Sequence, residues 1–450
     1  MPRSTGLSTA INLMTAMVDT TLRTAPKLWR SPLNRQYTRR NRDAGFTLTT
    51  ICIVLFEPLI SSALDLEPPF RINQLFPITL LLLGIALRPR HLRPAVWKHW
   101  PLAGLALLST TEYCALAMNL TPEVQKAARS LVINFFELAL FAVFLSIQDK
   151  STLSRLRRKI PVLLSSLSIF LCVLVLQAII AGKSFDSVTL RIGFGRDHPA
   201  TLGYLSAVLA VAHFYFSFAR YRSVVARITS SVALVAMMAT IFLSQTRGAW
   251  IAFGLAITAI IILQKKWIPA LVIGFGFAFI IATPFFTIRS AAETRNLRLD
   301  DWRTFRDVGS GRFGFWSMFL QEARSVSPLV GGGTGHAYQT SLNRSDLLDA
   351  FGRPTYVNVH NDFLLMYIDG GFLGCLFLAV FLLHLVSRSE LTPSLAVGLI
   401  VVALVCSCVD NFIAMNIVPL VLVFLNNAAV DSKRKLPHQA LLPNYLASTN

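Results

Sequence analysis

Apolar stretches of membrane-spanning length alternate with short polar or basic segments along most of the chain. An α-helix needs about 20 mostly apolar residues to cross a bilayer, so this pattern predicts about twelve transmembrane helices. They are expected near residues 46–64, 74–88, 101–118, 128–147, 161–181, 199–219, 226–244, 248–264, 267–288, 361–386, 392–409 and 411–427. The predicted fold class is therefore an all-α, polytopic membrane protein.

Composition and charge agree with this prediction. Of the 450 residues, 54% are hydrophobic and only 14% are charged, which is typical of an integral membrane protein. The formal net charge of +19 would suggest a nucleic-acid partner in a soluble protein. Here the basic residues gather in every second loop between spans, as the positive-inside rule requires. We therefore expect both termini in the cytoplasm, contacts with anionic membrane lipids and no nucleic-acid partner.

The predicted spans divide the chain into five parts. A basic cytoplasmic tail covers residues 1–45; its apolar run begins only near Phe46, so it does not resemble a cleaved signal peptide. Residues 46–288 hold the first nine spans, and 289–360 form one long outer loop. The last three spans occupy 361–427, and 428–450 form a second cytoplasmic tail.

The long loop is too rich in aromatic residues to be a simple linker. Residues 310–324 are predicted to form an amphipathic helix, with Phe313, Trp316 and Leu320 at helical spacing. The glycine-rich run 331–335 lacks the lysine of a nucleotide-binding P-loop and is predicted to be a flexible turn. We expect one or two helices on the outer membrane surface, followed by a mobile segment up to His360.

Arg247 lies in the run Ser244–Trp250, between two apolar stretches that together are long enough for two spans. A guanidinium held in such a short turn at the membrane surface favours an anionic partner such as a phosphate. Two further outer segments break the positive-inside rule by being basic: the loop of about 182–198, which contains Arg191 and Arg196, and the long loop, which contains Arg312. A shared polyanionic ligand explains all three, although Arg312 alone could be a solvated or snorkelling arginine.

Two more residues could carry chemistry at the outer face. His360 immediately precedes a span, and an imidazole at this position can act as a general base. The alternative is a structural helix start, capped by Asn358 or Asn361. Asp410 interrupts the last apolar hairpin and could orient His360 or pair with an arginine; the alternative is an ordinary polar turn.

Taken in order, five short motifs resemble the O-antigen ligase family and its wider (Wzy_C-like) polysaccharide ligase and polymerase superfamily. They are Arg191–Gly195, Ser244–Arg247, Gly311–Trp316, Val357–Asp362 with Gly370–Gly374, and Val409–Asp410. Each motif is short, but their order and their spacing around one long outer loop make the set specific. The resemblance covers roughly residues 190–425 and implies a GT-C-like fold.

The resemblance also implies an activity. It indicates an inverting, metal-independent glycosyltransferase of the bacterial inner membrane that needs no cofactor. The donor would be a glycan on undecaprenyl diphosphate, and the acceptor would be the lipid A–core oligosaccharide on the periplasmic face, in lipopolysaccharide biosynthesis.

Site residues follow from the resemblance position by position. Arg247 and Arg312 match the family arginines thought to hold the diphosphate, and His360 matches the proposed catalytic base. Substrate-binding positions are expected at Arg191, Arg196, Asn361 and Asp410, and no metal site is expected.

Two other functions remain open. An O-antigen or exopolysaccharide polymerase would share the arginine-lined outer site but would use a lipid-linked repeat unit as acceptor. A polysaccharide transporter or flippase is less favoured, because the chain shows no internal repeat and its polar signals gather on one face.

Overall fold

The computed structural model describes residues 32–63, 72–148, 150–181, 199–218, 224–265, 312–343, 359–387, 392–412, 415 and 417–428. The regular structure of these residues is helical, apart from an isolated bridge between Ser327 and Gly331. The chain divides into two units, residues 1–46 and 47–450. The described part of the first unit is the N-terminal portion of α2, so the predicted basic tail contains the start of a helix.

The described helices before the long loop are α2 (Pro32–Ala63), α3 (Ile72–Ala86), α4 (Leu92–Lys98), α5 (Trp100–Leu116), α6 (Pro122–Ser146), α7 (Lys150–Ile180), α8 (Pro199–Phe218), α9 (Val224–Ser244) and α10 (Arg247–Leu263). Short 3-10 turns precede α4 (Pro89–His91) and follow α5 (Ala117–Asn119). The later helices are α14 (Arg312–Glu322), α15 (His336–Leu342), α16 (Asp362–Ser387), α17 (Pro393–Val409) and α18 (Ile417–Ala428).

The helices confirm the all-α, multi-pass class of fold. Within the described ranges, 7 helices are long and apolar enough to cross a membrane, in α2, α5, α6, α7, α8, α9 and α16. The shorter apolar helices α3, α10, α17 and α18 coincide with the other predicted spans. The predicted span at 267–288 lies outside the described residues, so the total of about twelve stays a prediction.

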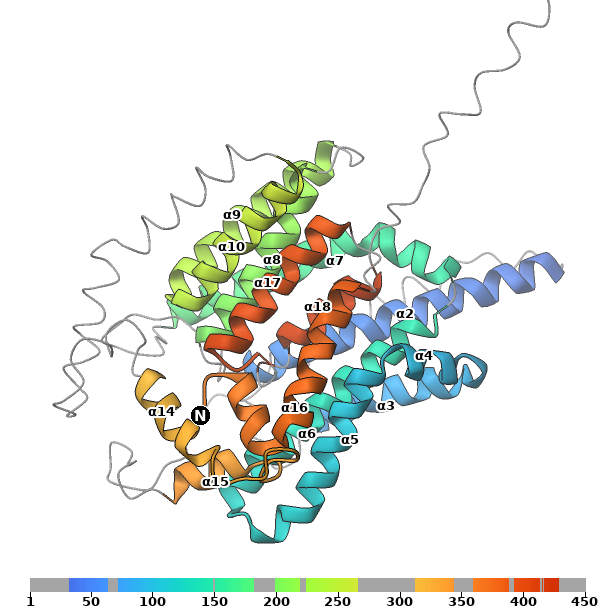
Figure 1. Ribbon diagram of the computed structural model, residues 1–450. Coiled ribbons are helices and arrows are strands. Elements are labelled where there is room, and N and C mark those ends of the chain that lie inside the picture. Colours follow the sequence, from blue (N-terminus) through green and yellow to red (C-terminus); the bar gives the residue numbers. More distant parts are fainter. Residues whose placement is uncertain are drawn as a thin grey trace, which may run out of the picture. The chain divides into compact units, whose positions relative to one another are not determined.

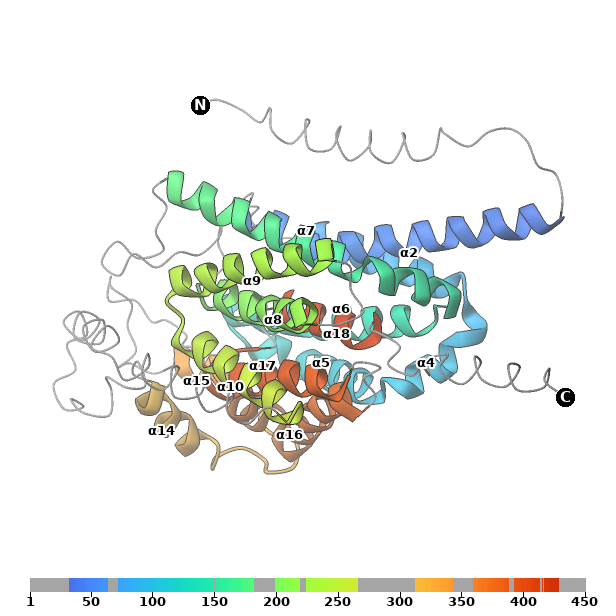
Figure 2. The ribbon, with the colours of Figure 1, turned by 90° about the horizontal axis from the view of Figure 1, so that it is seen from above.

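Helix α8 lies at the centre of the packing. It contacts α7, α9, α10, α17 and α18, and it is the most buried of the candidate spans. Figure 2 shows α8, α18 and α6 lying between α7 on one side and α10, α17, α5 and α16 on the other. Small residues such as Gly203, Ala207 and Ala210 allow this close approach, because membrane helices associate through tight packing rather than through exclusion of water.

Segments predicted to lie on the same side of the membrane contact one another at the same end of the bundle. Thr246, after α9, bonds to the first residue of α8, and His360, before α16, bonds to Asp410, after α17. At the other end, the His99 ring before α5 contacts the His384 ring near the end of α16. The end of the bundle at which α17 ends and α16 begins, beside α14 in Figure 1, is called the His360 end below.

Candidate active site at the His360 end

The turn that carries Arg247 is pinned to α8. Thr246 donates a hydrogen bond from Oγ1 to the carbonyl of Pro199 at 3.1 Å, and Ser244 Oγ bonds within the turn to Ile241 O at 2.8 Å. A Cβ at Gly203 would come within 2.8 Å of both Ser244 and Thr246, so only glycine lets α8 lie this close. Arg247 therefore begins α10 from a fixed position.

The start of α10 also contacts the end of α17. A Cβ at Gly248 would lie 1.9 Å from the Tyr204 hydroxyl and 3.1 Å from Val409 Cγ2. Asp410 follows Val409 directly and ends α17, with its N–H bonded to the carbonyl of Cys406 at 2.8 Å. The close packing at Gly248 thus brings the backbone of Arg247 to the helix end that carries Asp410.

Asp410 pairs with His360. The distance from His360 Nδ1 to Asp410 Oδ1 is 3.1 Å; the histidine side chain is 27% exposed and the carboxylate only 4%. A carboxylate on Nδ1 favours the tautomer in which Nδ1 carries the hydrogen, which leaves Nε2 able to accept a proton. The pair can therefore work as an oriented general base that remains partly accessible.

The backbone at His360 is unusual. Its φ is +51°, in the left-handed region that residues other than glycine rarely adopt. Directly after it, Asn361 Oδ1 accepts a hydrogen bond from the N–H of Leu364 at 3.0 Å and so caps α16. The structural alternative considered for this segment is thus correct for Asn361, whose side-chain oxygen already has this partner.

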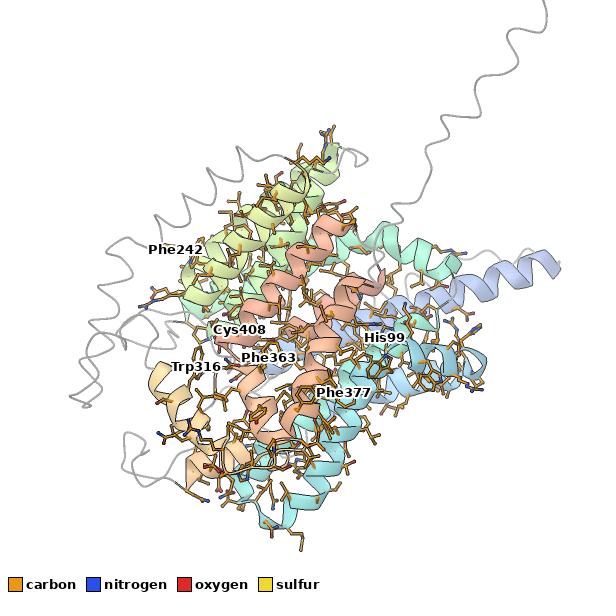
Figure 3. The ribbon with its side chains drawn as sticks, viewed as in Figure 1. His99, Phe242, Trp316, Phe363, Phe377 and Cys408 are labelled. Carbon is orange, nitrogen blue, oxygen red and sulfur yellow. The ribbon has the colours of Figure 1, made fainter. Side chains whose placement is uncertain are left out.

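Helix α14 contacts the same segment. Trp316 Nε1 donates a hydrogen bond to the carbonyl of Val359 at 2.9 Å, immediately before His360. The predicted amphipathic helix is confirmed at Arg312–Glu322, but its buried face is centred on Phe319, whereas Leu320 is 57% exposed. Figure 3 shows Trp316 at the same end as Phe363 and Cys408, the labelled neighbours of His360 and Asp410 in sequence.

The predicted site residues fall into three groups. His360 and Asp410 are in contact, and Arg247 begins the helix that packs against the end of α17. Arg312 is the first residue of α14, one helical turn before Trp316, and its side chain lies outside the described part of the structure. Arg191 and Arg196 lie outside the described residues.

Residues 328–337 correct one expectation. Residues 331–335 were expected to form a flexible turn, but Gly333, Thr334 and Gly335 are buried against α5, α6 and α16 and are held there by hydrogen bonds. Thr334 Oγ1 donates a hydrogen bond to Glu112 Oε2 of α5 at 2.8 Å. Fully buried Asp369 of α16 accepts hydrogen bonds from two backbone N–H groups of the segment. Asp369 was not among the residues predicted from the sequence, although a carboxylate inside a predicted span is a signal in itself.

Glu322, the last residue of α14, ties that helix to α15. Its Oε1 lies 2.9 Å from Ser325 Oγ, 3.1 Å from His336 Nε2 and 3.4 Å from Thr340 Oγ1. Burial alone would raise the pKa of Glu322, but the hydrogen bonds from Ser325 and His336, the charge on His336 and the Thr340 bond lower it below its ordinary value of 4.5. The ionised carboxylate therefore stabilises this corner.

Together these features define a class: a polytopic helical protein with a carboxylate-oriented histidine and an arginine-bearing turn at one end of its bundle. Residues 232–379 match the family model described as O-Antigen ligase. The resemblance to that family is thus confirmed over a segment that contains Arg247, Arg312 and His360, and it supports a ligase- or polymerase-type activity on a lipid-linked glycan. Asp410 lies beyond the matched segment. No curated protein matches the sequence.

Proposed function

We propose that the protein is an O-antigen ligase. It would transfer a polymerised glycan from undecaprenyl diphosphate to the lipid A–core oligosaccharide, on the periplasmic face of a bacterial inner membrane. The observation that carries this proposal is the His360–Asp410 pair at 3.1 Å, beside the arginine-bearing turn; His360 lies within the segment that matches the family.

The proposed reaction is a single displacement. The acceptor hydroxyl oxygen attacks the anomeric carbon of the donor sugar, the bond from that carbon to the phosphate oxygen breaks, and undecaprenyl diphosphate leaves. Attack from the face opposite the leaving group inverts the anomeric centre. His360 Nε2 accepts the hydroxyl proton, and Asp410 stabilises the imidazolium that forms.

The two arginines act on the leaving group. Negative charge grows on the diphosphate as the sugar–phosphate bond breaks, and a guanidinium offers paired donors that match phosphate oxygens. Arg247 is suited to this task because its turn is fixed by Thr246 and by the close packing at Gly248. Arg312 is the second proposed donor. Arg191, Arg196 and Asn361 remain proposed substrate-binding positions, and the mechanism needs neither a metal ion nor a cofactor.

A membrane-surface site suits such a donor. The polyprenyl tail stays in lipid while the diphosphate and the sugar lie at the interface, which is where an arginine and a histidine at helix ends can meet them. The positive-inside pattern supports an outward-facing His360 end and cytoplasmic termini.

A transporter would be favoured by a broken helix with backbone groups free to bind a substrate. Helix α16 does contain a break, at Gly371, but the carbonyls and amides freed there are bonded to residues 328–333. This arrangement supports an enzyme with a fixed site over a carrier with an open one.

The test is a lipopolysaccharide gel on a strain of the source organism that lacks the gene. We expect loss of the polymer ladder with intact core, together with accumulation of long lipid-linked polymer. A core that carries a single repeat unit would instead identify a polymerase, and an unchanged ladder would exclude both enzymes.

A further inference from the structure

Helix α16 is not continuous. Gly371 has φ +59° and ψ −153°, which interrupts the helical backbone inside a candidate membrane span. In an unbroken helix, the N–H of Phe372 would bond to the carbonyl of Ile368, and the N–H of Leu373 would bond to that of Asp369. The break removes both bonds and leaves two donors and two acceptors that need partners, because unpaired backbone groups are costly at membrane depth.

Residues 328–333 replace the two lost bonds with four others. The two freed carbonyls accept hydrogen bonds from successive amides of this segment, and the two freed amides donate to successive carbonyls of it. The bonds are Gly332 N to Ile368 O at 2.8 Å, Gly333 N to Asp369 O at 2.7 Å, Phe372 N to Pro328 O at 2.8 Å and Leu373 N to Leu329 O at 3.2 Å. The segment is thus inserted into the hydrogen-bond ladder of α16.

Two glycines make this insertion possible. A Cβ at Gly331, whose φ is +67°, would lie 2.4 Å from the carbonyl oxygen of Asp369. A Cβ at Gly371 would lie 2.4 Å from the carbonyl carbon of Leu329. Both contacts are with backbone atoms, which cannot move aside as a side chain can. Residues 328–333 and the break in α16 therefore fit together only because Gly331 and Gly371 have no side chains.

The Asp369 side chain locks the inserted segment. The carboxylate accepts hydrogen bonds from the N–H of Gly335 at 2.9 Å and from the N–H of Ala337 at 2.9 Å, which are otherwise unsatisfied donors at the start of α15. Asp369 is only 1% exposed, so these charge-assisted bonds form away from water.

The outer half of α16, Asp362–Gly370, is therefore held at both of its ends by residues 312–343. Trp316 bonds to the carbonyl of Val359 just before this half-helix begins, and the inserted segment with Asp369 fixes where it ends. The half-helix rises about 10 Å along its axis from Asp362 to Asp369, and His360 lies two residues before its start.

We propose that Asp369 is a positioning residue for His360. By locking residues 328–337 into the break, it sets the direction of the half-helix and thereby the alignment of the His360–Asp410 pair with the acceptor. This inference rests on the proposed function in so far as His360 is the base. Displacement of a catalytic group by about 1 Å can lower a rate by about 100-fold, so a loosened break is expected to reduce turnover more than substrate binding.

The test uses the full-length protein in lipid nanodiscs, with hydrogen–deuterium exchange and transfer kinetics measured on the same samples. Asp369→Ala removes both acceptors, and Asp369→Asn removes one. We expect faster exchange both at residues 335–337 and across 360–370, a fall in kcat of about 10- to 100-fold and a donor KM within about threefold of the wild type. Glu322→Gln is the matched control: this carboxylate bonds to Ser325, His336 and Thr340 of the α14–α15 region and not, among the described contacts, to α16. We expect kcat to change by less than about twofold.

Trp316→Phe provides a second variant in case Asp369→Ala does not accumulate. It keeps the ring but removes the N–H that bonds to Val359, and it should lower kcat without raising KM. The proposal is overturned if exchange rises only at 335–337 while residues 360–370 and kcat stay as in the wild type, or if the loss is in KM alone. Full activity of His360→Ala would instead refute the proposed function; the exchange data would then decide by themselves whether Asp369 orders the half-helix.

Discussion

The two halves of α16 are held by different kinds of contact. The outer half is fixed by directional hydrogen bonds: the Asn361 cap, the His360–Asp410 pair and the bonds to Asp369. The inner half, Phe372–Ser387, shares the backbone bonds of the break at its first two residues and beyond them packs on α5 through rings. Phe377 meets Trp100 edge to face at a centroid distance of 5.9 Å, and the His384 and His99 rings lie 5.3 Å apart.

This difference explains why one helix carries two histidines in such different settings. Packing tolerates small shifts, so it suits a segment that only needs to span the bilayer. Hydrogen bonds with a carboxylate fix position and tautomer, which a proton-accepting residue needs. Because of the break at Gly371, hydrogen bonds can fix the position of the outer half without disturbing the packing of the inner half.

The largest effect among the surrounding residues is expected at Arg247. Removal of a donor that stabilises charge in a transition state lowers kcat by about 100- to 1,000-fold, so Arg247→Ala should show a loss of this size. Arg247→Lys keeps the charge but not the paired donors, and its activity should lie between alanine and wild type. The measurement is kcat with purified protein, and Arg324→Ala, an exposed arginine of the loop region, is the control. An Arg247→Ala variant as active as the control would remove Arg247 from the mechanism.

The next largest effect on kcat is expected at Asp410, the carboxylate that bonds to His360. Asp410→Asn should lower kcat by about 10- to 100-fold with little change in donor KM, because the amide no longer fixes the Nδ1–H tautomer of His360. Exposed Glu123 at the start of α6 provides a control as Glu123→Gln, which should retain wild-type kcat. Equal rates for the two variants would show that Asp410 does not orient the base.

Substitutions in the inner half of α16 should lower the stability of the protein and leave its turnover unchanged. Phe377→Ala removes a half-buried ring that packs on Trp100 and should destabilise the protein by about 1–2 kcal/mol, less than a fully buried phenylalanine would. Thermal unfolding in detergent measures this, with Phe372→Ala as a control, since the Phe372 ring is 58% exposed. If Phe377→Ala lost turnover per folded molecule as strongly as Asp410→Asn, the contrast between the two halves would be wrong.

The smallest effect is expected at Glu322. Because its pKa is lower in the folded protein than the ordinary 4.5, its stabilising contribution is complete above that value and is lost as the pH falls through the folded pKa. Hydrogen exchange of α15 amides should therefore rise modestly as the pH is lowered below about 4.5, after correction for intrinsic rates. Glu322→Gln should remove this pH dependence; an unchanged profile in the variant would assign it to another group.

Much of the fold follows from the sequence because hydropathy marks spans directly. The predicted spans at 199–219 and 392–409 differ by about one residue from α8 and α17. The break in α16 could not be predicted in this way, since apolar composition continues through Gly371. Its signal was local, an aspartate followed by two glycines, and its partner segment lies more than thirty residues away in sequence.

Only part of the arrangement at the candidate site could be predicted from the sequence. His360, Asp410 and the Arg247 turn are candidates from the sequence alone, because polar groups at the ends of predicted spans are informative. Sequence spacing could not reveal that Asn361 caps the helix or that Gly248 brings α10 against α17. These contacts depend on the tertiary packing of helices that are distant in sequence.

His360, the proposed catalytic base, stands directly before the outer half of α16. The most direct test compares His360→Ala with His384→Ala, two identical substitutions at opposite ends of the same helix. The measurement is the single-turnover rate of glycan transfer from undecaprenyl diphosphate by purified protein in vesicles. The account predicts a loss of about 100- to 10,000-fold for His360→Ala and a rate within about threefold of wild type for His384→Ala. Equal rates for the two variants would contradict it.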